Sequence, residues 1–599
     1  MKNCSLTGPD RIDDNEFRFD SFDNGKVLHN KKKGRLPAMG WNSWNAFGSG
    51  NTEALTKEIV DKMIELGLDK LGYRYIVLDD GCYKPERVDG KLSNEETRFP
   101  SGFRALSDHI HKKGFKFGMY NDIGTRLCAG AYVGTCGHER EDAKSYIEWG
   151  VDFIKVDNCY YLWDNATFSE AENVRFVYAP AIASVTVTGP ICESGKPFEK
   201  EFSAGRDMFT EGEGVRTEEI DGSVYFTHIG TFDGTGPMRT PVRPESGEVC
   251  FDLNADESGT YRFDLKCLTG REEGRGSWLQ IAALRKDTGE VKYIFDAEYS
   301  GDPVEAVLEK GEYKIRLMNH RRQENTLFSY AKFLEGLKEA DPDNDVIYSL
   351  CEWGKTQPQN WAKKVGDSWR ILNDISFHVG SDGDPGFTSW TDGYTPAVTS
   401  QYNKAVVMDE FSGLDKGWND PDMMVIGMGG LDTVQYRTHM TMWCMMNSPL
   451  MLGLDLRRVQ KGDEIYNIIA NKEVIDLNQD PLGIQAKRVY CSLLEKDSDR
   501  EYVTNNNRVD ILAKPLSDGS IAISFINVSD HVKTEGLEIS LSNIVKAFEG
   551  KIDLSGLLKA SSYEIKDLWT GEFKNSAVKV FKADSLKPHD QLTIRVWGK

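Results

Sequence analysis

Charged side chains follow several apolar segments of this sequence. The clearest case is WGVDFIKVDNC, residues 149–159, where Lys155 and Asp157 interrupt a run of apolar residues. Successive side chains of a strand point to opposite faces, so residues two apart share a face. We therefore expect a lysine ammonium beside a carboxylate at a strand end, where the nearby cation favours the ionised acid.

Eight short apolar segments end in this way, four before residue 160 and four after residue 340. Their terminal residues, in chain order, are Trp41, Asp79 and Asp80, Tyr120 and Asp122, Lys155 and Asp157, Glu352 and Trp353, Arg370 and Asp374, Asp420 and Asp422, and Asp455. A single aspartate at a strand end needs no function, but so many converging acids would repel one another unless a ligand used them. Carboxylates accept hydrogen bonds from sugar hydroxyls, and two suitably placed carboxyls can cleave a glycosidic bond. We interpret the set as a carbohydrate site.

A metal site is the competing use for so many acids. No histidine ends any of the eight segments, and His109 and His111 fall within a predicted helix. Asp420-Pro-Asp422 resembles the DxD motif of nucleotide-sugar transferases, but no glycine-rich phosphate loop accompanies it. We therefore expect neither a metal nor another cofactor.

Strand-like and helix-like segments alternate around these residues. EALTKEIVDKMIELG, for example, has apolar residues at helical spacing and a glycine stop, and it stands between LPAMGWNSW and YRYIVLDD. Such alternation predicts a parallel sheet. Eight strands within residues 36–162 and 325–482 suit a (β/α)8 TIM barrel, so the predicted fold class is α/β.

Two further regions predict antiparallel sheets. Residues 163–324 contain alternating segments such as TYRFDLKCL and EYKIRLMN, which predicts a β-sandwich-like domain inserted after the fourth strand. Residues 483–599 contain RVDILAKPL, SIAISFINV and QLTIRVWG, which predicts a C-terminal β-sandwich. Residues 1–35 form an N-terminal extension. The role of the insert is open between shielding the barrel and binding carbohydrate or Ca²⁺, for instance through residues 230–236.

Composition restricts the partners. A net charge of −21 would repel nucleic-acid phosphates, and no segment is apolar enough to cross a membrane. The N-terminal residues lack the apolar core of a signal peptide, and the 11 cysteines show no metal-ligand spacing. We expect a cytoplasmic protein with mostly free thiols and a small carbohydrate as its partner. The sequence leaves a homo-oligomer open.

The motifs at the strand ends resemble those of glycoside hydrolase family 27, which contains α-galactosidases and α-N-acetylgalactosaminidases. The matching segments, in family order, are MGWNSW, LDD, GMYNDIG, CAG, WGVDFIKVDNC, SLCEWG, WRILNDI, WNDPDM and NQDPLG. The resemblance implies a retaining double displacement, with Asp157 as nucleophile and Asp374 as general acid/base, their carboxyls about 5 Å apart. Asp374 would then hold a proton until the leaving group departs, a form that the surrounding acids favour.

The same resemblance implies which residues bind the sugar. The expected lining of the pocket is Trp41, Asp79, Asp80, Tyr120, Cys128, Lys155, Glu352, Arg370 and Asp422. In the family, the acid pair after the second strand binds galactose O4 and O6, and an acid at Glu352 leaves no room for an acetamido group. The expected substrate is therefore a terminal α-D-galactosyl residue. Cys128 and Cys159 match a disulfide pair of the family; whether they are bonded here is left open.

Two departures from the family pattern keep alternatives open. Cys82 replaces a tryptophan that is usual after the acid pair, and Lys355 replaces an apolar residue. The alternatives within the family are an α-N-acetylgalactosaminidase, a β-L-arabinopyranosidase and an isomaltose-releasing glucan hydrolase. The alternative from another class is a non-catalytic sugar-binding protein, against which the presence of both Asp157 and Asp374 argues.

Overall fold

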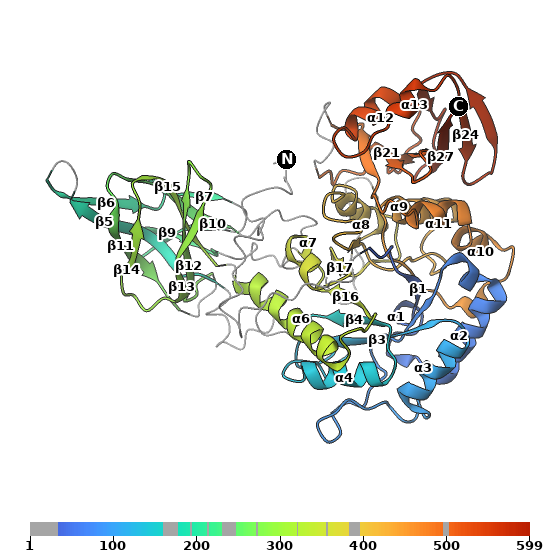
Figure 1. Ribbon diagram of the computed structural model, residues 1–599, viewed down its shortest axis with the longest axis horizontal. Helices are drawn as coiled ribbons and strands as arrows, with labels where there is room; N and C mark the ends of the chain where they lie inside the picture. Colours follow the sequence, from blue (N-terminus) through green and yellow to red (C-terminus); the bar gives the residue numbers. More distant parts are fainter. Residues whose placement is uncertain are drawn as a thin grey trace. The chain divides into compact units, whose positions relative to one another are not determined.

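The computed structural model describes most of the chain in ten segments (Figure 1). These are residues 34–159, 178–191, 195–211, 215–229, 247–270, 274–319, 321–354, 358–381, 396–494 and 502–599. They divide into two compact units, one holding residues 34–159 and 330–599 and the other residues 178–329. The second unit begins and ends close to the boundaries predicted for the insert. The N-terminal extension lies outside the described residues except for Gly34 and Arg35.

The first unit contains a parallel barrel sheet. Its strands are β1 (Met39–Asn42), β2 (Tyr75–Val77), β3 (Lys116–Asp122), β4 (Phe153–Asp157), β16 (Ile347–Cys351), β17 (Ser368–Arg370), β18 (Trp418–Asp420) and β19 (Leu450–Leu452). They pair in the order β18-β17-β16-β4-β3-β2-β1-β19. A parallel bridge between Met424 and Leu452 joins the two ends of this sheet, with Met424 N donating to Met451 O at 2.9 Å. The predicted (β/α)8 barrel is therefore confirmed.

Helices surround these strands, as Figure 1 shows for α2, α3 and α4. The barrel helices are α1 (Trp44–Phe47), α2 (Glu53–Leu66), α3 (Gly102–Lys112), α4 (Glu139–Glu148), α6 (Arg321–Ala340), α7 (Pro358–Trp361), α8 (Val398–Ala405), α9 (Thr433–Met445), α10 (Glu464–Ile469) and α11 (Lys472–Asn478). The ends of helix α2 follow from its sequence. The Thr52 side chain accepts a hydrogen bond from Leu55 N at the start, and Gly67, at φ 74°, ends the helix. Its apolar stripe, which includes Ile59 and Met63, is buried.

The second unit is a sandwich of two antiparallel sheets, which bears out the all-β nature predicted for the insert. One sheet has the order β13-β12-β15-β10-β7 and the other β14-β11-β5-β9-β8, with β6 paired to β5. Their strands are β5 (Ala181–Ile191), β6 (Pro197–Ser203), β7 (Phe209–Glu211), β8 (Arg216–Ile220), β9 (Ser223–Thr227), β10 (Glu248–Ala255), β11 (Gly259–Leu268), β12 (Trp278–Arg285), β13 (Val291–Glu298), β14 (Val304–Leu308) and β15 (Gly311–Met318).

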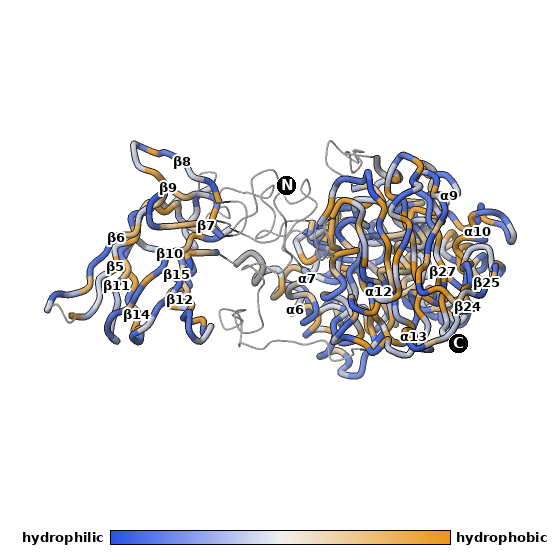
Figure 2. The backbone as a smooth tube through the Cα atoms, turned by 90° about the horizontal axis from the view of Figure 1, so that it is seen from above, coloured by the Kyte–Doolittle hydropathy of each residue, from blue (hydrophilic) through white to orange (hydrophobic). Residues whose placement is uncertain are grey.

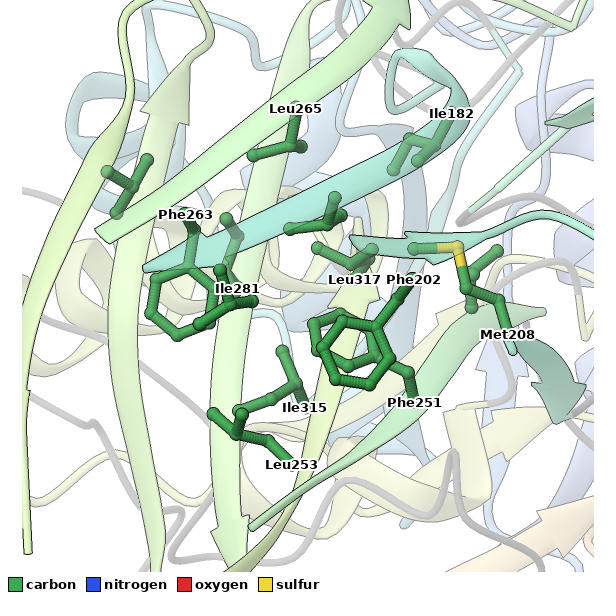
Figure 3. Close-up of a cluster of buried hydrophobic side chains, with 14 of the residues drawn as sticks. Ile182, Phe202, Met208, Phe251, Leu253, Phe263, Leu265, Ile281, Ile315 and Leu317 are labelled. Atoms are coloured by element: carbon green, nitrogen blue, oxygen red, sulfur yellow. The ribbon is translucent and has the colours of Figure 1, made fainter. Parts of the chain in front are cut away.

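The sandwich has its own apolar core (Figure 3). Phe202 of β6 and Phe251 of β10 stack across it with ring centroids 4.3 Å apart. Along β11 buried and exposed residues alternate, and Figure 2 shows hydrophilic and hydrophobic residues mixed along the strands of this unit. The alternation is what a sheet with one buried face requires. The loop proposed for Ca²⁺ binding, residues 230–236, lies outside the described residues.

The C-terminal region of the first unit is a second antiparallel structure. Its main sheet has the order β20-β21-β22-β27-β24-β25, and β23 pairs with β26. The strands are β20 (Lys487–Cys491), β21 (Val509–Pro515), β22 (Ile521–Asn527), β23 (Glu538–Ser540), β24 (Tyr563–Asp567), β25 (Phe573–Ser576), β26 (Val580–Lys582) and β27 (Gln591–Gly598), with helices α12 (Leu541–Ala547) and α13 (Ser555–Lys559). Among the described helices, none is long and apolar enough to cross a membrane.

Candidate active site

The register of the parallel strands brings Asp157 and several other predicted site residues to one level. Tyr120 of β3 pairs with Lys155 of β4, and Asp122 pairs with Asp157. On the other side of β4, Cys351 of β16 pairs with Asp157. All lie at the carboxyl ends of their strands, where the active sites of (β/α)8 enzymes are found.

Lys155 contacts two carboxylates. Its Nζ lies 2.9 Å from Asp79 Oδ2 and 3.9 Å from Asp157 Oδ1. The predicted pairing with Asp157 is present, but the closer partner comes from the loop after β2. The ammonium also lies 5.2 Å from the ring centroid of Tyr120. Its pKa is raised well above the usual value because the attraction of Asp157 and Asp79 outweighs the effect of burial.

The two oxygens of Asp157 have different surroundings. Oδ2 accepts a hydrogen bond from Tyr120 Oη at 3.0 Å and lies 3.2 Å from Cys128 Sγ. Oδ1 is buried and accepts no hydrogen bond from any described residue. One oxygen is thus held in place, while the other is left to react.

Burial sets the protonation of Asp157. The residue is 5% exposed, and burial raises the pKa of its carboxyl to about 7, although the Lys155 ammonium lowers it. The sequence suggested that Lys155 would keep Asp157 ionised. In the structure its attraction only partly offsets the loss of hydration, because Lys155 is shared with Asp79 and Asp79 itself repels a charge on Asp157.

The acid pair after β2 is also built into the site. Asp79 Oδ2 accepts hydrogen bonds from Asn42 Nδ2 at 2.7 Å and from Lys155 Nζ at 2.9 Å. Asp80 Oδ2 accepts from Ala129 N at 2.6 Å, whereas Asp80 Oδ1 is buried without a hydrogen-bond partner among the described residues. Burial, and then the charge of Asp79, raise the pKa of Asp80 to about 6. Asp80 therefore offers a free acceptor to a hydroxyl group.

Arg370 organises the opposite side of the site. Its Nη2 lies 2.7 Å from Asp422 Oδ2 and 3.0 Å from Asp374 Oδ1, while its Nε is buried without an acceptor in the described part of the chain. Trp353 Nε1 also donates to Asp374 Oδ1, at 3.2 Å. Burial raises the pKa of Asp422, against the attraction of Arg370. The Asp374 side chain is 47% exposed, so it stands at the mouth of the site.

Two of the predicted strand ends are wrong in detail. β17 ends at Arg370, and Asp374 lies in the following loop, not on the same strand face. The loop is held because Ile375 N donates to Asp422 Oδ2 at 2.8 Å. Asp455, the predicted acid of the eighth strand, instead caps the short helix Leu456–Arg458 and binds Arg457 at 2.9 Å. The Asp455 carboxylate is therefore used to cap this helix and to bind Arg457.

Trp41 and Glu352 are buried near the carboxyl ends of β1 and β16. Trp41 is fully buried and its Nε1 donates to Leu454 O at 2.9 Å, so its ring has no open face here. Glu352 is also fully buried, directly after β16. The next residue, Trp353, has φ 56°, and Asp422 has φ 79°. Non-glycine residues at such angles are strained, and strain of this kind concentrates at functional sites.

A disulfide bond flanks Asp157. Cys128, in the loop after β3, is bonded to Cys159, two residues after Asp157, with their Cα atoms 5.4 Å apart. Asp122 supports both loops, because its carboxylate accepts Gly124 N and Cys159 N, each at 2.6 Å. Asp122, Cys128 and Cys159 have the mutual spacing of metal ligands, but the disulfide removes the thiolates that a metal would require.

Sequence reasoning assigned no role to three contributors, although it named Trp353 among the strand-end residues. Asn42 binds Asp79, Trp353 binds Asp374, and Cys351 accepts a hydrogen bond from Arg370 Nη1 at 3.6 Å beside Asp157. All three stand next to a predicted site residue in the sequence or in strand register, so position at the strand end was the available signal. Lys355, the unusual residue after Glu352, lies outside the described residues.

Comparisons with known proteins agree with this architecture. A family model described as Alpha galactosidase A matches residues 36–177 and 321–480. A second model, described as Alpha galactosidase C-terminal beta sandwich domain, matches residues 506–596. The first match is interrupted where the inserted sandwich stands.

Individual relatives are similar over most of the chain. An alpha-galactosidase of Cyamopsis tetragonoloba is 26% identical over 538 residues, which cover 90% of this chain and 80% of the relative. The structure of an alpha-galactosidase from Saccharomyces cerevisiae matches with a TM-score of 0.59 at 21% identity, covering 96% of this chain and 100% of that one. A β-L-arabinopyranosidase from Geobacillus stearothermophilus matches the fold with a TM-score of 0.52 at 16% identity, covering 94% and 97%. Since the first family model spans half of the chain and the second matches its C-terminal sandwich, the chain belongs to the alpha galactosidase A family, glycoside hydrolase family 27, which its strand-end motifs resembled.

Proposed function

We propose that the protein is a retaining α-galactosidase that releases terminal α-D-galactosyl residues from small carbohydrates. The observation that carries the proposal is the unequal pair of carboxyls. Asp157 is buried, with one oxygen held and the other free of hydrogen bonds from the described residues, while Asp374 is half exposed and held by Arg370 and Trp353. Retaining hydrolysis needs such a pair, one group to attack carbon and one to handle the proton.

In the first step, Asp157 Oδ1 attacks the anomeric carbon from the face opposite the leaving group. The bond between that carbon and the glycosidic oxygen breaks, and Asp374 transfers its proton to the departing oxygen. The product is an ester between Asp157 and the sugar. Tyr120 and Lys155 fix the reacting carboxylate, so little reorientation is needed when the bond forms.

In the second step, Asp374 removes a proton from water as the water attacks the same anomeric carbon. The ester bond to Asp157 breaks, which returns the carboxylate and releases the sugar with its original anomeric configuration. The exposure of Asp374 suits this step because water and leaving group must both reach it. Arg370, between Asp374 and Asp422, stabilises the carboxylate that forms when Asp374 gives up its proton.

The acceptors of the pocket favour a galactose-configured sugar. The family resemblance assigns the acid pair to O4 and O6, and Asp80 Oδ1 is a buried acceptor without a partner among the described residues. Arg370 Nε is a buried donor that likewise has no acceptor among the described residues. Such groups cost free energy until a ligand satisfies them, so they favour a substrate with hydroxyls at those points.

A β-L-arabinopyranosidase is the second candidate. Its substrate lacks the hydroxymethyl arm, and Cys82, which is buried behind the acid pair, replaces an aromatic residue usual in the family. A panel of nitrophenyl glycosides separates the two candidates. Turnover of the α-galactoside should exceed that of the β-L-arabinopyranoside, and a clear preference for the arabinoside would overturn the choice.

The roles of the two acids need their own test. Asp157→Asn should abolish hydrolysis while galactose still binds. In a separate experiment on the wild type, NMR of freshly released sugar should show the α-anomer. Release of the β-anomer first would contradict the retaining mechanism. A cytoplasmic location stays a prediction, which cell fractionation can check.

A further inference from the structure

Helix α8, Val398–Ala405, is the feature of the barrel that the mechanism leaves unexplained. All eight of its residues are buried, although they read VTSQYNKA and include five polar uncharged side chains and a lysine. A helix buried on all sides is normally apolar, because each buried polar group must find a partner. The partners of these side chains therefore indicate what the helix holds together.

One face of α8 holds the loop that carries Asp374. Gln401 Nε2 donates to Asn373 O at 2.7 Å, and Lys404 Nζ donates to Ile371 O at 2.6 Å. Residues three apart on a helix lie on the same face, so the two side chains act together. Both carbonyls belong to the short segment between Arg370 and Asp374.

The start of α8 fixes the rest of the same loop. Val398 N donates to His378 O at 3.0 Å and Thr399 N donates to Val379 O at 2.9 Å. The first N–H groups of a helix have no partner within it, and here they are satisfied by the loop. The backbone on both sides of Asp374 is thus bonded to one helix.

The other face of α8 is bound to the C-terminal sandwich. Tyr402 Oη donates to Asp510 Oδ2 at 3.0 Å, and Arg508 Nη2 donates to Asn403 Oδ1 at 2.5 Å. Asn506 Oδ1 accepts from Asn403 Nδ2 and Asn506 Nδ2 donates to Thr399 Oγ1, each at 3.0 Å.

Arg508 and Asp510 are a fully buried ion pair, with Nε 3.0 Å from Oδ2. Two buried charges contribute little net stability, because their loss of hydration offsets their attraction, and such pairs are best explained by the geometry that they specify. Here the pair specifies the position at which α8 packs against the C-terminal sandwich. The pair lies at the start of β21, so the sandwich contributes a rigid strand end to this contact.

We propose that the C-terminal sandwich positions the general acid/base through α8, with Gln401 and Lys404 as positioning residues for Asp374. The inference rests on the proposed role of Asp374. The Asp374 side chain is 47% exposed, and its hydrogen bonds with described residues reach only Oδ1, so its orientation depends on the backbone that α8 holds. Displacement of a reacting group by about 1 Å costs on the order of 100-fold in rate.

The test compares substrates whose leaving groups need different amounts of protonation. The variants are Lys404→Met and Gln401→Met on the loop side, and Tyr402→Phe, which removes only the hydroxyl bound to Asp510, on the sandwich side. Thr438→Val is the matched control, because Thr438 Oγ1 of α9 donates to His589 O at 2.7 Å across the same interface. For each protein kcat/KM, which reports the step in which the leaving group departs, is measured with dinitrophenyl and methyl α-galactosides, and Tm by thermal unfolding.

For the loop-side variants we expect kcat/KM on the methyl galactoside to fall by about 10- to 100-fold and on the dinitrophenyl galactoside by far less. Tyr402→Phe should show the same bias at smaller amplitude. Thr438→Val should lower Tm without changing the ratio of the two rates. Equal losses on both substrates, or a lower Tm with an unchanged ratio in all three variants, would overturn the inference.

Asp374→Ala separates this inference from the proposed function. If Asp374→Ala itself shows no bias against the methyl galactoside, the acid/base assignment fails. If it shows the bias and the α8 variants do not, only the positioning role fails.

Discussion

Lys155 Nζ lies 2.9 Å from Asp79 Oδ2, so the cation of β4 is bound mainly to the loop after β2 and not to the carboxylate on its own strand. This arrangement ties the sugar-binding acid pair to the reacting acid. It also leaves Asp157 with a pKa raised to about 7 by burial. The Lys155 ammonium, which Asp157 shares with Asp79, is the cation that opposes this rise in the pKa of Asp157.

The first prediction concerns pH. Asp157 must be ionised to attack, so kcat/KM should fall as pH drops below about 7. Lys155→Met removes the cation that favours the ionised form, so the acid limb of the profile should move upward by about 1–3 pH units. The measurement is kcat/KM against pH with a chromogenic α-galactoside.

Lys116→Met is the control for this profile, since Lys116 Nζ makes a similar ion pair with Asp152 Oδ1, at 2.9 Å, before β4. Its acid limb should stay in place. An unmoved limb in Lys155→Met would show that the lysine does not set the ionisation of Asp157.

The second prediction concerns sugar specificity. Asp80→Asn removes the charged acceptor assigned to the pocket, and a lost hydrogen bond to a charged group costs about 1.5–3 kcal/mol. We expect kcat/KM for the α-galactoside to fall about 10- to 100-fold, chiefly through KM. The β-L-arabinopyranoside, which has no hydroxymethyl arm, serves as internal comparison and should be affected less. Equal effects on both sugars would remove Asp80 from contact with that arm.

The third prediction concerns the disulfide. The bond between Cys128 and Cys159 closes a loop of 31 residues, a kind of constraint that typically stabilises by about 2–4 kcal/mol. Treatment with dithiothreitol should therefore lower the Tm of the wild type but not that of Cys128→Ala/Cys159→Ala. Activity should fall in parallel, because the pair contacts Asp157. Cys136→Ser, which alters a free cysteine between the two, should respond to the reductant like the wild type.

The fourth prediction concerns the insert. Its core is built from residues of its own strands, including Ile182, Phe263 and Leu317. A fragment of residues 178–320 should consequently fold alone and unfold cooperatively in circular dichroism. A fragment without a cooperative transition would show that this core needs the barrel.

Much of the barrel could be predicted because its signals are local. The apolar runs that end in Asp79, Tyr120 and Asp157 mark their strands in the sequence, and the order of the motifs fixed the fold. Strand ends were harder to predict where a side chain, and not a neighbouring strand, accepts a hydrogen bond from the backbone. WRILND has the apolar pattern of a strand, but Asp422 binds Ile375 N and turns the chain after Arg370.

Long-range partners could not be predicted from spacing. Asp79 and Lys155 are 76 positions apart, and only the closed sheet brings them into contact. The polar residues of α8 suggest an exposed helix, whereas two separate regions of the chain cover them. The pairing of Cys128 with Cys159 was suggested only by the family resemblance, which left the bond itself open, since the number of cysteines alone allows many pairings.

The single bridge that closes the barrel has a consequence for its dynamics. A single bridge, Met424 to Leu452, links the segment after β18 to β19, whereas β3 and β4 share five register pairs. Fewer bonds have to break for a local fluctuation to separate the two edges. The amide of Met424 should then exchange its hydrogen for deuterium sooner than those of β4. Local opening of the barrel should therefore begin at this bridge.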